Sequence, residues 1–109
     1  MSISLPDPIY LGYRAWRVRY DSGCTDDEYG ETVPNKGLIL ISSGQDGPAE
    51  VDTVLHECLH AMMHNTGNVL KHKEEEQVVT LLAHGLVELL QRNPHLFVWA
   101  FERLGEESK

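Results

Sequence analysis

The chain has 109 residues, 41% of them hydrophobic, and a formal net charge of −8. This length predicts one domain, residues 1–109, with an ordered core over about residues 9–104. The negative charge argues against a nucleic-acid-binding surface and an anionic membrane surface, since both need clustered Lys and Arg. The two cysteines, Cys24 and Cys58, are expected to be reduced thiols. Because no secretory or membrane-spanning segment can be recognised, we expect a cytoplasmic location.

The first forty residues predict β-structure. Residues 9–11 form a short apolar run that ends at Gly12, a turn or bulge position, and residues 13–20 alternate between apolar and charged side chains. Residues 31–33 and 38–41 add two further short strand candidates. We expect a small, mainly antiparallel sheet of about three strands.

The remaining residues predict about three helices, which makes the fold class α+β. Pro48 suits the first position of a helix that ends near Gly67. A second helix is expected from about residue 73 to residue 92, with an apolar stripe formed by Val78, Val79, Leu82, Leu86, Leu89 and Leu90. Asn93-Pro94 then predicts the start of a third helix, whose buried side is expected to consist of Phe97, Val98, Phe101 and Leu104.

The first of these helices carries the pentapeptide His56-Glu57-Cys58-Leu59-His60. Residues four apart lie on one face of a helix, so His56 and His60 can direct both imidazoles at one Zn²⁺, with Glu57 beside them as general base. The apolar stripe of the same helix is centred roughly 150° from the midpoint of the two histidines. One face therefore packs on the sheet and the other presents the histidines. Cys58 belongs to the packing face and is expected to be a core thiol.

A catalytic zinc ion usually takes three protein ligands and a water molecule. His64 continues the four-residue spacing, but it lies about 12 Å from His56 along the helix axis. Ligand atoms at about 2 Å from one ion cannot be spread that far. His64 is therefore expected at the edge of a cleft or on the surface.

Glu75 is the preferred third ligand. On a helical wheel it falls near the centre of the apolar stripe of the second helix, where an unpaired carboxylate is costly and a zinc ion would compensate its charge. Glu76 is the next candidate, and His72 and Cys24 remain further alternatives.

A histidine pentapeptide followed by a glutamate on the next helix resembles the gluzincin metallopeptidases. The short chain, the β-rich start and the segments 55–61, 74–79 and 82–86 narrow the resemblance to the minigluzincins, including the small versions carried by phages. The resemblance spans about residues 9–100. It implies a zinc peptidase domain with zinc held by His56, His60 and one glutamate of the second helix, with Glu57 catalytic. Related domains act as regulatory proteases on protein partners.

These observations lead us to expect a zinc-dependent metallopeptidase that hydrolyses a peptide bond of a peptide or protein substrate. An extended substrate could pair with a sheet edge, for which residues 38–41 are the candidate strand. Tyr29, His64 or His72 could supply a further hydrogen bond. Two alternatives remain open: a catalytically silent zinc-binding interaction domain, and a different zinc hydrolase that uses Cys24 as the peptide deformylases use a cysteine. The oligomeric state is left open.

Overall fold

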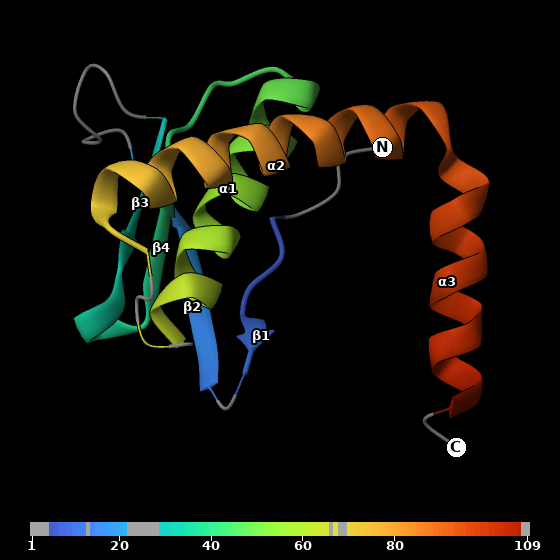
Figure 1. Ribbon diagram of the computed structural model, residues 1–109, viewed down its shortest axis with the longest axis horizontal. Coiled ribbons are helices and arrows are strands. Elements are labelled where there is room, and N and C mark those ends of the chain that lie inside the picture. The colour runs from blue at the N-terminus through green and yellow to red at the C-terminus, as the bar shows by residue number, and fades with distance from the viewer. Residues whose placement is uncertain (1–4, 13, 22–28, 66, 68–69, 108–109) are drawn as a thin grey trace.

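The computed structural model describes residues 5–12, 14–21, 29–65, 67 and 70–107 (Figure 1). The fold is α+β, as predicted: a four-stranded sheet comes first and three helices follow. The strands are β1 Ile9–Leu11, β2 Arg14–Tyr20, β3 Gly30–Val33 and β4 Leu38–Ile41, with a 3-10 turn at Pro34–Lys36 before β4. The helices are α1 Gly47–Asn65, α2 His72–Arg92 and α3 Pro94–Glu107.

The strand order in the sheet is β1-β2-β4-β3. Two of the pairings, β1 with β2 and β3 with β4, are antiparallel, and the central pairing of β2 with β4 is parallel. The expectation that residues 38–41 form a sheet edge is wrong, because β4 lies between two strands and β3 forms that edge. The physical reason is visible in the sequence of β4, Leu-Ile-Leu-Ile, which is apolar at every position as interior strands are.

The core lies between the sheet and α1. Trp16 and Val18 of β2 and Ile39 and Ile41 of β4 pack against the buried Cys58 and Ala61 of α1. The prediction that Cys58 is a core thiol is therefore confirmed, since it is a free cysteine and buried. In Figure 1, α1 lies against the sheet and α2 crosses over α1, so that α1 is positioned between the strands and the second helix.

The predicted buried face of α2 is right in part, and that of α3 is largely wrong. α2 packs on α1 through the fully buried Val79, a member of the predicted stripe, and Ala83, whereas the stripe members Val78, Leu82 and Leu89 are exposed. α3 turns at the end of α2 and lies apart from the sheet (Figure 1), and on its predicted buried side Val98, Phe101 and Leu104 are exposed. Among the described elements, α2 is the principal neighbour of α3. Across the described part of the chain, no helix combines the length and apolar character needed to cross a bilayer.

Candidate metal centre

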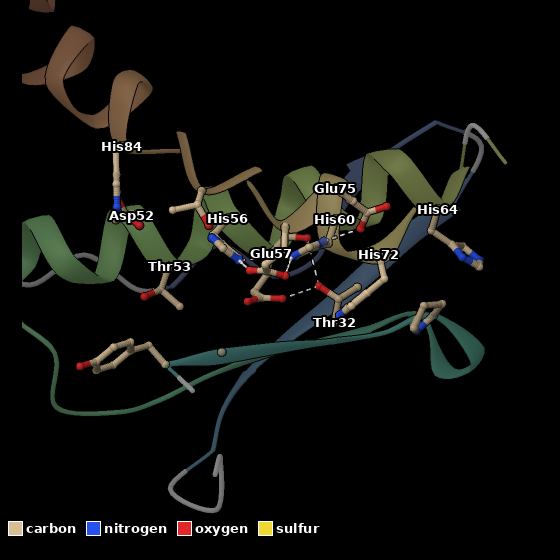
Figure 2. Close-up of a pocket in the computed structure, with 15 residues that line it drawn as sticks. Thr32, Asp52, Thr53, His56, Glu57, His60, His64, His72, Glu75 and His84 are labelled. Atoms are coloured by element: carbon tan, nitrogen blue, oxygen red, sulfur yellow. Dashed lines mark hydrogen bonds and ion pairs between the residues drawn. The ribbon is translucent and has the colours of Figure 1, made fainter. Parts of the chain in front are cut away.

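α1 places the two histidines of the pentapeptide toward α2. The helix begins after Asp46, whose carboxylate accepts a hydrogen bond from the backbone N–H of Ala49 (2.9 Å) and so caps the first turn. One turn separates His56 from His60, and their Nε2 atoms lie 3.2 Å apart. Figure 2 shows both rings on the side of α1 that faces the start of α2.

Glu76 of α2 completes this group. Its Oε1 lies 2.8 Å from His56 Nε2 and its Oε2 lies 3.0 Å from His60 Nε2. Among the described residues, His56, His60 and Glu76 are the set whose potential ligand atoms all lie within 4.8 Å of one another. Both histidines predicted as ligands are therefore brought together, and the carboxylate that meets them belongs to Glu76.

Glu75, which the sequence favoured as third ligand, lies on the other side of His60. Its Oε2 is 2.6 Å from His60 Nδ1, the ring nitrogen that points away from Glu76. Glu75 is the more buried of the two glutamates, with 12% of its side chain exposed against 46% for Glu76. The wheel argument was thus right about the burial of Glu75 and wrong about which carboxylate reaches the paired Nε2 atoms.

The two carboxylates around His60 leave one acceptor pair to be compensated between the two helices. When His60 donates its Nδ1–H to Glu75, a neutral ring carries only a lone pair on Nε2. That lone pair would face a carboxylate oxygen of Glu76 at 3.0 Å, which places two acceptors against each other. Either a proton on His60 or a metal ion bound to Nε2 removes this conflict.

The donor set fits zinc. Two imidazole nitrogens and one carboxylate oxygen are the ligands of a common class of catalytic zinc site. Bonds of about 2.0–2.1 Å in tetrahedral geometry separate neighbouring ligand atoms by about 3.3 Å, and the two Nε2 atoms lie 3.2 Å apart. The carboxylate of Glu76 is at a similar distance, with Oε1 2.8 Å from His56 Nε2 and Oε2 3.0 Å from His60 Nε2. The group lines a cleft of about 490 Å³, which leaves room for water and for a ligand.

Glu57 lies beside the histidines and is nearly inaccessible to solvent, with 6% exposed. The hydroxyl of Thr32 donates to Glu57 Oε1 at 2.6 Å and also lies 3.1 Å from the backbone oxygen of the same residue. Burial raises the pKa of the Glu57 carboxyl above its usual value, while the Thr32 hydrogen bond and the neighbouring histidines oppose that rise. A carboxylate held in this way suits a general base.

Gly30 allows β3 to approach α1 closely enough for Thr32 of the strand to contact Glu57 of the helix. A Cβ at this position would lie 2.8 Å from Thr53 Cγ2, 3.0 Å from Glu57 Cγ and 3.0 Å from the backbone oxygen of Leu40. Since these distances are below those of ordinary van der Waals contact, any side chain at residue 30 would push β3 away from Glu57. The glycine therefore fixes the spacing between β3 and Glu57.

The other predicted candidates have different positions. Tyr29, His64 and His72 all line the cleft, and the ring of His64 also meets the buried ring of Trp16 edge to face at 6.4 Å. The expectation of a cleft-edge position for His64 is in agreement with this placement. Cys24 lies outside the described residues.

Sequence reasoning missed two features of the cleft. Thr32 carried no motif, because its partner Glu57 is 25 residues away. The second is a contact between His84 Nδ1 on α2 and Asp52 Oδ2 on α1 at the cleft wall (Figure 2). The sequence spacing could have pointed to this pair. Asp52 lies one helical turn before His56 on α1, and His84 lies eight residues after Glu76 on α2.

No protein-family model, no curated protein and no solved structure matches the chain.

Proposed function

We propose that this protein is a zinc-dependent peptidase of the minigluzincin type, with His56, His60 and Glu76 as the metal ligands. The observation that carries the proposal is the position of the Glu76 carboxylate, one oxygen against each histidine Nε2. The assignment replaces the expected Glu75 with its neighbour in sequence. Glu75 takes a supporting role, because a carboxylate on Nδ1 fixes the ring of His60 with Nε2 toward the ion and raises its basicity.

Zinc in this position would polarise a scissile carbonyl and acidify water. The protein's own contribution begins with Glu57, which takes a proton from the attacking water and delivers it to the leaving amine. Thr32 holds Oε1 of that carboxylate at 2.6 Å, so the carboxylate is oriented before the substrate arrives. The low exposure of Glu57 keeps bulk water from competing for the proton.

β3 supplies a surface for the substrate. It is the edge strand on the side of the sheet next to the cleft, and Gly30 and Thr32 line that cleft. An extended peptide that adds to the free edge of β3 by backbone hydrogen bonds would pass the metal ligands. The sequence predicted that a substrate strand would pair with residues 38–41, but that strand, β4, is already paired on both sides. We therefore propose residues 30–33 as the pairing strand.

The test compares the wild type with Glu57→Gln after both are loaded with zinc. Metal content is measured by mass spectrometry of the protein-bound element, and cleavage is measured on a broad peptide library with product identification. We expect equal zinc content and cleavage by the wild type alone. Turnover retained in Glu57→Gln would end the general-base assignment.

Zinc binding without cleavage of any peptide by the wild type would favour the alternative of a silent zinc-binding interaction domain. The buried carboxylate of Glu57 argues against it, since a purely structural site has no need for a desolvated carboxylate next to its ligands. The alternative that uses Cys24 predicts that Cys24→Ser loses zinc and Glu76→Gln does not. The cytoplasmic location stays a prediction.

A further inference from the structure

α3 exposes apolar side chains over more than half of its circumference. At 100° per residue, Leu96, Leu104, Phe101 and Val98 span a sector of about 200°, and the charged Glu102 and Arg103 lie outside this sector together with Trp99. The exposed fractions of these five apolar residues run from 43% to 81%. An apolar sector of this width is typical of a helix that packs on more than one neighbour.

The outer side of α2 continues this surface. On the sides that do not pack on α1, the helix exposes Val78, Leu81, Leu82 and Leu89, of which Leu81 is 73% exposed. We call the exposed apolar residues of α2 and α3 together the α2–α3 surface. α3 joins α2 at Asn93, so the two parts of this surface are adjacent in the fold (Figure 1).

The size of the α2–α3 surface is that of a protein interface. The exposed fractions correspond to roughly 600 Å² on α3 and about 350 Å² on α2, whereas the largest apolar patch of a typical monomer is about 300–600 Å². A standard interface buries about 800 Å² on each partner. A helix of 14 residues is also marginal by itself in water, so α3 depends on packing for its stability.

Charge indicates which partner fits. The chain carries a net charge of −8, so two copies repel each other over most of their surface. Most of the α2–α3 surface avoids this repulsion, because α2 has no Asp, Glu, Lys or Arg between Glu76 and Glu88 and α3 has none before Glu102. Two copies can therefore meet along residues 77–87 and 94–101 without bringing carboxylates together, while Leu89 and Leu104 lie at the charged borders of the surface.

We propose that the α2–α3 surface is a homodimer interface, in which α2 and α3 of one copy pack with α2 and α3 of a second copy about a two-fold axis. Such an arrangement makes a four-helix layer, and α3 gains apolar contacts on the sides that α2 leaves open. The interface leaves the cleft accessible, because Val78 and Leu81 lie roughly 140–160° around α2 from Glu76, on a different side of the helix. The proposal does not depend on the peptidase assignment.

The experiment measures the mass of the full chain by sedimentation equilibrium from micromolar to several hundred micromolar concentration. The test variants are Phe101→Glu on α3 and Leu81→Glu on α2. Tyr10→Glu is the matched control, since Tyr10 is 76% exposed on β1, away from the α2–α3 surface. We expect a dimeric wild type, a dimeric control, and a dimer about a hundredfold weaker in each test variant, because each substitution occurs twice in the interface.

Circular dichroism of each variant establishes that the helices are retained. Trp99 gives a second readout, because its emission should shift to shorter wavelength as the concentration rises, while Trp16, fully buried, should not respond. A wild type that stays monomeric at every concentration would overturn the proposal, whether or not it binds lipid vesicles. A dimer that neither Phe101→Glu nor Leu81→Glu weakens would overturn it equally.

Discussion

The three consecutive glutamates at the start of α2 lie in three different environments and so provide a test of the proposed ligand set. Glu76 approaches both histidine Nε2 atoms, Glu75 contacts Nδ1 of His60, and Glu74 is exposed. The same Glu→Gln exchange at each position removes the same charge within one helical turn. Differences in zinc affinity among the three variants therefore report direct contact with the ion, because the long-range electrostatic effect of losing one negative charge is similar in all three.

The expected magnitudes follow from the geometry. Four-ligand structural zinc sites bind with about 10–16 kcal/mol. One ligand then corresponds to about 3–4 kcal/mol, which predicts a loss of roughly 10²–10³-fold in affinity for Glu76→Gln. Removal of a carboxylate behind a histidine ligand costs about 10–100-fold, and Glu75→Gln falls at the lower end because its amide oxygen can still accept the Nδ1–H. Glu74→Gln should match the wild type.

Zinc affinity is measured by competition with a chromophoric chelator at neutral pH. Circular dichroism before and after addition of metal controls for loss of the fold. If Glu75→Gln loses more affinity than Glu76→Gln, the ligand assignment drawn from the distances is refuted and the sequence argument for Glu75 is restored. Equal losses in all three variants would show that only the total charge matters.

Three further predictions concern the surroundings of this centre and the fold. Thr32→Val should lower the free energy of unfolding by about 1–3 kcal/mol in a denaturant titration and should reduce cleavage, because Glu57 loses its hydroxyl partner inside the protein. Unchanged stability and turnover would exclude a role of Thr32 in orienting Glu57. Asp7→Asn should be less stable than the wild type at neutral pH, because hydrogen bonds from an arginine and from the backbone N–H of Val18 hold the pKa of Asp7 well below its usual range. A carboxyl with a lowered folded pKa stabilises above its unfolded pKa of about 4 and loses that contribution as the pH falls, so thermal melts of the two proteins should converge in acid; a pH-independent difference would contradict this. Burial raises the pKa of the Cys58 thiol to about 11, so it should resist alkylation at neutral pH until denaturant is added, as mass spectrometry of Cys24→Ser can show.

The helix that carries the pentapeptide was predictable because its signals are local. A proline at the helix start, an apolar stripe and two histidines one turn apart can all be recognised within twenty residues, and α1 has these features in place. The same holds for the strands, whose positions follow from apolar runs and alternation. Their pairing is different, since the parallel contact of β2 with β4 joins segments about twenty residues apart and nothing local determines it.

The choice between Glu75 and Glu76 depended on the rotation of α2, which local sequence does not determine. The wheel placed Val78, Val79, Leu82, Leu86, Leu89 and Leu90 on the core side of α2. The structure instead centres the buried face on Val79 and Ala83, roughly 60° further around the helix than this apolar stripe suggests. This rotation brings Glu76 to the histidines and leaves Leu82 exposed. The preference for Glu75 and the misplaced core residues of α2 both follow from apolar side chains that belong to the α2–α3 surface.

If zinc binds at the histidine–glutamate group where α1 and α2 meet, metal supply contributes to the stability of this helix pair. α2 contributes two fully buried side chains, Val79 and Ala83, and the proposed ion would add a further link between the helices. An ion present at a thousand times its dissociation constant would add about 4 kcal/mol to the stability of the native state, against about 5–15 kcal/mol for an ordinary domain. Zinc depletion would then let α1 and α2 separate more often and would make the chain more susceptible to proteolysis.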